Sequence, residues 1–174
     1  DPVLHLIGLA DGRSLNYDKL ILATGAVPRT LPQVAGLKNV HVLRSPDDAA
    51  ALRRAMQTAN TAVVIGGGYI GLEAAASFRK AGLTVHVVEA AERLLARVAS
   101  PDMSAFFQEL HQRQGVFIHT GMTETKFHQK DVLFTGITLD TGEQISAELL
   151  VVGIGVEPES VLADAIGAET GNGI

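Results

Sequence analysis

A glycine-rich segment between two apolar runs constrains the fold of this chain more than any other feature. The segment contains, in order, an apolar run, three glycines in the pattern G-x-G-x-x-G, a helical stretch, a second apolar run and an acid: 62–65, Gly66, Gly68, Gly71, 69–80, 84–88 and Glu89. Short apolar runs joined by a tight turn and a helical stretch are typical of a strand–helix–strand unit in a parallel sheet. The segment therefore predicts an α/β fold with a helix from about residue 69 to residue 80.

Each glycine has a physical reason in such a unit. Gly66 would let the chain turn sharply off the strand, Gly68 would let the backbone approach a pyrophosphate, and Gly71 would let the helix pack closely on the sheet. The helix would then point the N–H groups of its first turn, at Tyr69 and Ile70, towards the phosphates. We predict a dinucleotide site here, and the alternative is that the glycines only form a tight turn.

The acid at the end of the second run indicates which dinucleotide would bind. Glu89 can accept hydrogen bonds from both ribose hydroxyls, and its charge would repel a 2′-phosphate, so we predict NAD rather than NADP. Arg93 and Arg97 follow closely and keep NADP open as an alternative. A nucleotide-triphosphate loop is excluded, because that loop requires Gly-Lys-Ser/Thr and this chain has Gly-Leu-Glu at 71–73.

Composition restricts the class of protein further. Hydrophobic residues make up 47% of the 174 residues and charged residues 19%, which is ordinary for a globular α/β protein. The net charge of −5 and the scattered basic residues argue against a nucleic-acid partner. The chain has no cysteine, no apolar run long enough for a membrane span and no visible signal peptide. We therefore expect a cytoplasmic protein without a membrane or nucleic-acid partner.

The remaining sequence predicts further elements on both sides of the glycine segment. Before it we expect strands over 3–9 and 14–22, with 20–23 as a buried central strand, a crossover over 30–44, and a helix from Ser45 to about Thr58. After it we expect a helix over 100–115, a third parallel strand at 116–118, an antiparallel meander over 126–147 and a buried strand at 149–152. The helix over 100–115 carries an apolar stripe that we expect to pack in the core: Met103, Phe106, Phe107 and Leu110.

Three blocks of this sequence, at 17–29, 64–73 and 149–158, resemble the pyridine-nucleotide-dependent flavoprotein oxidoreductases. Within that family the chain is most similar to ferredoxin reductases that serve Rieske dioxygenases and cytochrome monooxygenases, with rubredoxin reductases close by. The resemblance implies a Rossmann-like three-layer NAD(P)-binding domain, with a parallel sheet and an antiparallel β-meander, flanked by strips of an incomplete FAD-binding domain. The implied boundaries are 1–42 for part of the FAD domain and the crossover, 43–152 for the NAD domain and 153–174 for the return into the FAD domain.

The resemblance also implies roles for single residues. Those expected to hold NADH are Gly66, Gly68, Tyr69, Ile70 and Gly71 at the phosphates, Glu89 at the adenosine ribose, Arg97 near the adenine half, and Gly153, Ile154 and Gly155 beside the nicotinamide. Those expected to touch FAD are Thr24, Gly25 and Arg29. Glu73, which we place in the first turn of the helix, is the catalytic candidate, because the matching acid of the family reaches towards nicotinamide and flavin. The alternative for Glu73 is a stabilising acid at a helix start.

The implied activity is that of a FAD-dependent NAD(P)H oxidoreductase of the ferredoxin–NAD⁺ reductase type. NADH passes a hydride to FAD, and electrons then pass to a ferredoxin-type iron–sulfur protein, so no protein nucleophile or metal ligand set is needed. The alternatives are a rubredoxin, a quinone or a small electrophile as acceptor, a nucleotide-binding fragment without turnover, or a signalling flavoprotein resembling apoptosis-inducing factor. The family's first glycine motif would precede Asp1, and its later Gly-Asp motif would follow Ile174. We therefore expect this chain alone to hold FAD weakly and to be inactive.

Overall fold

The fold is known from a computed structural model that describes residues 1–173. Its contacts divide the chain into two compact units, each described here by itself. Unit 1 comprises Asp1–Val27 and Val156–Ile174, and unit 2 comprises Pro28–Gly155. The boundaries expected at residues 42 and 152 both fall inside unit 2. The assignment of the chain's parts to an FAD domain and an NAD domain stays a prediction.

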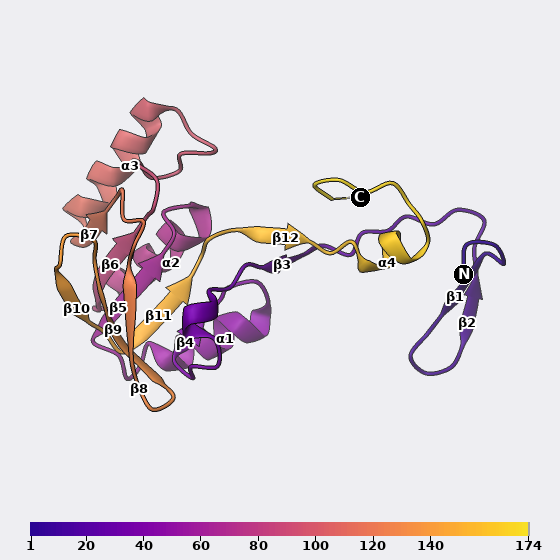
Figure 1. The fold of residues 1–174 in the computed structure, drawn as a ribbon, viewed down its shortest axis with the longest axis horizontal. Helices are drawn as coiled ribbons and strands as arrows, with labels where there is room; N and C mark the ends of the chain where they lie inside the picture. The colour runs from indigo at the N-terminus through magenta and orange to yellow at the C-terminus, as the bar shows by residue number, and fades with distance from the viewer. Residues whose placement is uncertain (174) are drawn as a thin grey trace. The chain divides into compact units, whose positions relative to one another are not determined.

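A five-stranded parallel sheet forms the centre of unit 2 (Figure 1). Its strands, in spatial order, are β4 (Val40–His41), β11 (Leu149–Val152), β5 (Thr61–Ile65), β6 (Thr84–Val88) and β7 (Val116–His119). All neighbouring strands pair in parallel. Both central strands, β5 and β11, are buried on their two faces, which explains why their sequences read as unbroken apolar runs. The predicted α/β class with a parallel sheet is confirmed.

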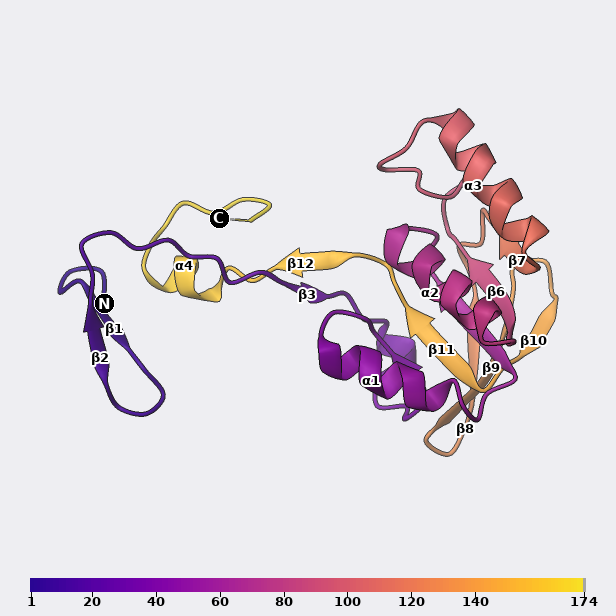
Figure 2. The ribbon, with the colours of Figure 1, turned by 180° about the vertical axis from the view of Figure 1, so that it is seen from behind.

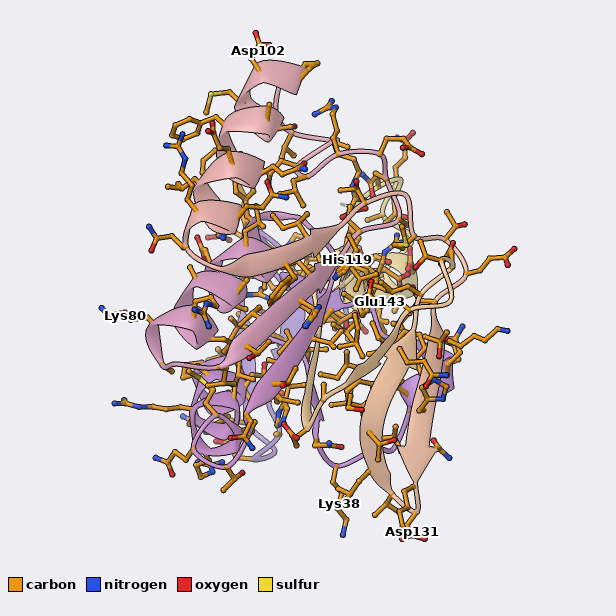
Figure 3. The ribbon with its side chains drawn as sticks, turned by 90° about the vertical axis from the view of Figure 1, so that its left-hand side faces the viewer. Lys38, Lys80, Asp102, His119, Asp131 and Glu143 are labelled. Carbon is orange, nitrogen blue, oxygen red and sulfur yellow. The ribbon has the colours of Figure 1, made fainter. Side chains whose placement is uncertain are left out.

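Helices cover one face of this sheet (Figures 1 and 2). They are α1 (Pro46–Ala55), α2 (Tyr69–Lys80) and α3 (Pro101–Arg113). Figure 3 labels Lys80 at the carboxyl end of α2 and Asp102 in the first turn of α3. Phe78 of α2 is fully buried here against Val64 and Val87 of the sheet's helix side.

An antiparallel meander and a short 3₁₀ turn cover the other face. The meander has the order β10 (Gln144–Ser146), β9 (Leu133–Thr138), β8 (Lys126–Lys130), and the turn is η1 (Pro32–Val34). Phe134 and Ile137 of β9 are buried against Val63 and Leu150. Because successive strand residues point to opposite faces, Val63 faces the meander whereas Val64 faces the helices. The expected antiparallel meander is therefore present.

Helix boundaries follow the capping residues closely. Ser45 caps α1 in a capping box, in which its side chain accepts from the Asp48 amide and the Asp48 carboxylate accepts from the Ser45 amide. Ser100 caps α3 through the amide of Met103. Helix α2 has the predicted bounds, whereas α1 ends at Ala55, three residues before the predicted end. The segment read as a crossover also supplies the two-residue edge strand β4, which is too short to give a sequence period.

Unit 1 differs from the prediction at residues 20–23. It contains β1 (Leu6–Gly8) paired with β2 (Ser14–Asn16), β12 (Val156–Pro158) and α4 (Val161–Ala165). Strand β3 (Ala26–Pro28), which pairs with β12, belongs to unit 1 as far as Val27. The expected central strand at 20–23 is wrong: these residues form no strand, and Ile21 is 89% exposed. The physical reason is that a strand needs a neighbour to complete its backbone hydrogen bonds, and no strand among residues 1–173 pairs with this segment.

The apolar stripe on α3 is a second correction. Met103, Phe106 and Leu110 are 46%, 55% and 42% exposed, and only Phe107 packs partly against the core. Helix α3 lies beside β7, the edge strand of the sheet, so the sheet covers only the helix side that carries Ser104 and Phe107. The helical period was read correctly, but it does not say which side of an apolar helix faces the sheet.

Replacement of two phenylalanines should separate the core from this exposed stripe. Phe78→Ala removes a fully buried ring from the helix side of the sheet and should lower the free energy of unfolding by about 3–5 kcal/mol. The matched control, Phe106→Ala, removes an exposed ring and should change it by less than about 1 kcal/mol. Urea unfolding followed by circular dichroism measures both. Equal losses in the two variants would contradict the placement of α3.

Candidate dinucleotide-binding site

Three loops meet at the carboxyl ends of the central strands, which is where ligands bind in open parallel sheets. The Gly66 amide donates to the Val88 carbonyl at 2.8 Å, and the Gly153 amide donates to the Ile65 carbonyl at 2.7 Å. The turn after β5 is therefore bonded to the ends of both neighbouring strands, β6 and β11. The structure thus brings the predicted segments at 66–71, 89 and 153–155 to one edge of the sheet.

The three glycines of the motif have three different surroundings. Gly66 has a φ of +106°, and a Cβ placed on it would lie 2.4 Å from the Gly153 carbonyl oxygen. A Cβ on Gly71 would lie 2.0 Å from the Gly66 carbonyl oxygen, so this glycine lets α2 pack against the turn. At Gly68, in contrast, a Cβ would meet nothing within 4 Å. Only Gly68 faces open space, which is the surrounding expected for a glycine that a pyrophosphate approaches.

Sequence reasoning missed Gly67, the unassigned middle residue of the turn. A Cβ on Gly67 would lie 2.4 Å from Cδ2 of Leu94 and 3.2 Å from the Glu89 side chain. Its amide donates to Oε2 of Glu89 at 2.6 Å, and its carbonyl accepts from the Leu95 amide at 2.9 Å. The signal in the sequence was the run of three consecutive glycines at 66–68, whose middle glycine the motif itself does not require.

The amino end of α2 points into this site without a side-chain cap. Gly68 is its N-cap residue and offers no side chain to the first-turn amides. Tyr69 is 59% exposed and Ile70 is 37% exposed, so their side chains are accessible beside those amides. An uncapped amino end with its dipole is a ready anion site when a ligand phosphate completes it.

Glu73 does not lie where the sequence analysis placed it. Helix α2 begins at Tyr69, so its first turn contains no acid and Glu73 is the fifth helical residue. Its side chain is exposed, and the Glu73 carbonyl accepts from the Ser77 hydroxyl. The expected stabilisation of the first turn is therefore wrong, because the dipole effect falls off within that turn. A catalytic role for Glu73 stays a prediction.

Glu89 is fixed by the backbone on both of its oxygens. Oε2 accepts from the Gly67 amide at 2.6 Å, and Oε1 accepts from the Ala91 amide at 2.8 Å. The Glu89 amide itself donates to the His119 carbonyl at 2.8 Å, which ties it to the end of β7. The carboxylate thus joins the glycine turn to the loop after β6 and is held at one position. Its contact with a ribose stays a prediction.

Arg97 lies beside the segment after β11. Its side chain is exposed, and a Cβ placed on Gly155 would lie 3.5 Å from its guanidinium. Gly155 has a φ of +108°, which favours glycine there. The sequence analysis assigned Arg97 to the adenine half and Gly153, Ile154 and Gly155 to the nicotinamide half. The structure brings Arg97 and Gly155 together, and both roles stay predictions.

The three residues expected to touch FAD, Thr24, Gly25 and Arg29, precede the glycine turn in the sequence and make hydrogen bonds of their own. In unit 1 the Thr24 hydroxyl donates to the Glu159 carbonyl, and the Glu159 amide donates to the Gly25 carbonyl at 2.9 Å. In unit 2 the exposed Arg29 donates its amide to the Gly155 carbonyl at 2.9 Å. These contacts order the backbone at each place, and the flavin roles of the three residues stay predictions.

Two histidines form a stacked pair close to Glu89. Nδ1 of His86 lies 3.1 Å from Nε2 of His119, and the His86 ring also stacks on Phe117 at 4.7 Å. Burial lowers the pKa of both histidines, His119 lowers the pKa of His86 further, and the charge of Glu143 opposes both shifts. Figure 3 shows His119 and Glu143 in this region. Among residues 1–173 no group of three or more potential ligands could hold a metal ion.

A family model described as pyridine nucleotide-disulphide oxidoreductase matches residues 3–174. The chain belongs to this family. Putidaredoxin reductase from Pseudomonas putida is 42% identical over 172 residues, which cover 95% of this chain and 41% of that protein. The resemblance inferred from the three sequence blocks is therefore confirmed.

Two solved structures are similar over almost the whole chain. The ferredoxin reductase for the CYP199A2 system of Rhodopseudomonas palustris has a TM-score of 0.94 and 40% identity, covering 100% of this chain and 43% of that one. The covalent complex of putidaredoxin reductase with putidaredoxin gives a TM-score of 0.91 and 41% identity, covering 99% and 43%. The chain thus spans about two fifths of the length of the relatives it matches. Within the described part of the chain, no helix has the length and apolar character needed to cross a bilayer.

The histidine pair predicts how stability depends on pH. A lowered pKa means that the folded chain resists a proton that the unfolded chain accepts near the ordinary value of 6.5. Above that pH both states are neutral at these positions, and below it the free energy of unfolding should fall as pH falls. Glu143→Gln removes the charge that raises both pKa values, so the fall should become steeper. Urea unfolding between about pH 7.5 and pH 5.5 measures this, and an unchanged slope in the variant would contradict it.

Proposed function

We propose that this chain is the NADH-binding part of a FAD-dependent reductase that transfers electrons to a ferredoxin-type iron–sulfur protein. One observation carries the proposal: the glycine turn has two positions closed by backbone, Gly66 and Gly71, and one open position, Gly68, beside the uncapped end of α2. That combination suits a pyrophosphate, because the backbone can approach it closely and the helix amides can bond to it.

The rest of the nucleotide follows from the neighbouring loops. Glu89 would take the adenosine ribose, because its carboxylate lies at the end of β6 and is fixed by two amides. Each carboxylate oxygen can accept more than one hydrogen bond, so ribose hydroxyls can be added without breaking those to Gly67 and Ala91. Residues 153–155 would lie along the nicotinamide half, with Arg97 at the exposed side of the site. Glu73, exposed on α2, would face the nicotinamide.

A bound FAD would supply the chemistry that takes a hydride from NADH and passes on single electrons, and the residues predicted to hold it are Thr24, Gly25 and Arg29. Among the described residues of unit 1, Ala163 is the only buried hydrophobic side chain. The Thr24 hydroxyl donates its hydrogen to the Glu159 carbonyl. These residues do not form a flavin site by themselves. The proposal therefore gives this chain a site for NADH, while Thr24, Gly25 and Arg29 would supply part of the flavin contacts.

The acceptor is proposed from the relatives. Two of them are named for the redoxins that they reduce or bind, and one is solved in a covalent complex with putidaredoxin. An iron–sulfur protein is therefore the proposed partner. NADH-driven reduction by the flavin-loaded protein, compared between a ferredoxin, a rubredoxin and a quinone, would identify the acceptor.

The chain should bind NADH more tightly than NADPH. The Glu89 carboxylate would oppose a 2′-phosphate, and a like-charge contact in an interface costs several kcal/mol, so the ratio of dissociation constants should be at least about tenfold. Isothermal titration calorimetry with both nucleotides measures it. Equal or reversed affinities would remove the role given to Glu89, and absence of NADH binding would refute the proposed function.

Two alanine substitutions should separate packing from binding. Gly71→Ala places a methyl group against the Gly66 carbonyl and should lower the free energy of unfolding by about 2 kcal/mol or more. Gly68→Ala meets no neighbour and should cost less than about 1 kcal/mol, yet it should weaken NADH binding at least about tenfold, because the methyl group would stand where the pyrophosphate approaches. Chemical unfolding and calorimetry give the two values. NADH binding by Gly68→Ala at the original affinity would contradict the placement of the phosphates.

A further inference from the structure

Ser104 is the one polar side chain that is buried among residues 1–173, with 2% of its surface exposed. It lies on α3, outside the glycine turn and outside every role assigned above. Its hydroxyl donates to the Leu94 carbonyl at 2.6 Å and accepts from Nη1 of Arg93 at 2.6 Å. A buried hydroxyl that is bonded on both sides fixes its partners in place, because breaking either bond leaves a polar group unsatisfied.

Arg93 extends this contact across the loop after β6. Its Nη1 also donates to the Ala99 carbonyl, and its Nη2 donates to the Ala96 carbonyl, both at 2.9 Å. Residues 90–100 form neither helix nor strand, so their carbonyls lack the partners that a regular element would provide. One planar guanidinium and one hydroxyl satisfy three of them, at 94, 96 and 99, and so give an irregular loop a single shape.

The same loop is bound to the glycine turn on its other side. The Leu95 amide donates to the Gly67 carbonyl at 2.9 Å, and Leu95 takes a left-handed φ of +53° to do so. The fully buried Leu94 side chain fills the space that a side chain at Gly67 would need. Arg97 is therefore placed between two anchored carbonyls, those of Ala96 and Ala99.

We propose that Arg93 and Ser104 are positioning residues that hold the loop from Glu89 to Ser100 in the shape that binds the adenosine half of NADH. The inference rests on the proposed function. Neither residue touches the nucleotide; both act through Arg97 and through the Leu95 contact with the glycine turn. Arg93 follows Glu89 closely, but three of its five N–H groups are bonded to two carbonyls and the Ser104 hydroxyl, so we assign it to the loop rather than to a 2′-phosphate.

The chain offers a matched control at the opposite end of the sheet. Arg79 of α2 donates to the Gln114 carbonyl at 3.1 Å and to the Leu83 carbonyl, just before the amino ends of β7 and β6. It is a second arginine that fixes loop carbonyls, but it lies away from the carboxyl ends where the nucleotide would bind. Lysine at either position keeps the charge and loses the planar fork.

The test compares Arg93→Lys with Arg79→Lys in the 174-residue chain, using NADH and NADPH as probes in calorimetry and thermal unfolding as the measure of stability. Arg93→Lys should weaken NADH and NADPH by the same factor, about tenfold, because the loop would lose charge-assisted hydrogen bonds to two partly buried carbonyls. Arg79→Lys should lower the melting temperature similarly and leave both affinities unchanged. Ser104→Ala should act as Arg93→Lys does, and it serves as the second variant where the first fails to fold.

Each other outcome overturns the inference. If Arg93→Lys and Ser104→Ala bind NADH with the affinity of the unsubstituted chain, the positioning role is refuted and the proposed function is unaffected. Equal losses of affinity in Arg93→Lys and Arg79→Lys would show a general effect of stability. A larger loss for NADPH than for NADH in Arg93→Lys would assign Arg93 to the phosphate itself. An original chain that binds no NADH would instead refute the proposed function, on which the positioning role depends.

Discussion

The close approach of backbone to backbone at the turn after β5 is the constraint on which the rest of unit 2 depends. The Gly66 carbonyl lies where a side chain at Gly71 would be, and the Gly153 carbonyl lies where a side chain at Gly66 would be. These contacts place α2 directly on the sheet and bring the end of β11 against the turn. The helix can therefore aim its amino end at the same edge at which β6 delivers Glu89. Hydrophobic packing of Phe78 and its neighbours stabilises the layers, but it does not by itself determine this geometry.

Sequence reasoning succeeded where local chemistry and tertiary packing agree. The bounds of α2 and β11 were predicted to the residue, because a glycine turn and an unbroken apolar run each mark them. It failed where the burial of a segment depends on which other element packs against it. Residues 20–23 are as apolar as a central strand but have no neighbouring strand among the described residues, and the α3 stripe faces away from the sheet because α3 lies at the edge beside β7. Apolar character gives the capacity for burial, whereas topology decides whether burial occurs.

The candidate site shows the same division. Motif spacing predicted that the three glycines and Glu89 lie at one edge of the sheet, because a motif encodes backbone geometry of this kind. It could not identify Gly67, Arg93 or Ser104, since their roles arise from contacts between segments far apart in the sequence. Ser104 reads as one more polar residue inside a helix. Only its burial, with both hydrogen-bonding partners in the loop after β6, gives it significance.

The charges around the site indicate how it would attract an anionic nucleotide while the chain carries a net charge of −5. Both oxygens of Glu89 accept from backbone amides, and the Arg93 guanidinium donates to two carbonyls and a hydroxyl, so each side chain is held in place and keeps its charge. The Glu89 charge would therefore oppose an anionic ligand, and three of the Arg93 N–H groups are directed at the protein's own oxygens. In the proposed site, the attraction for a pyrophosphate would come mainly from the uncapped amides of α2, with the exposed Arg97 nearby. Such a site recognises phosphate by the direction of its N–H groups rather than by net charge. Its affinity then depends on how rigidly the turn and the loop after β6 hold that direction.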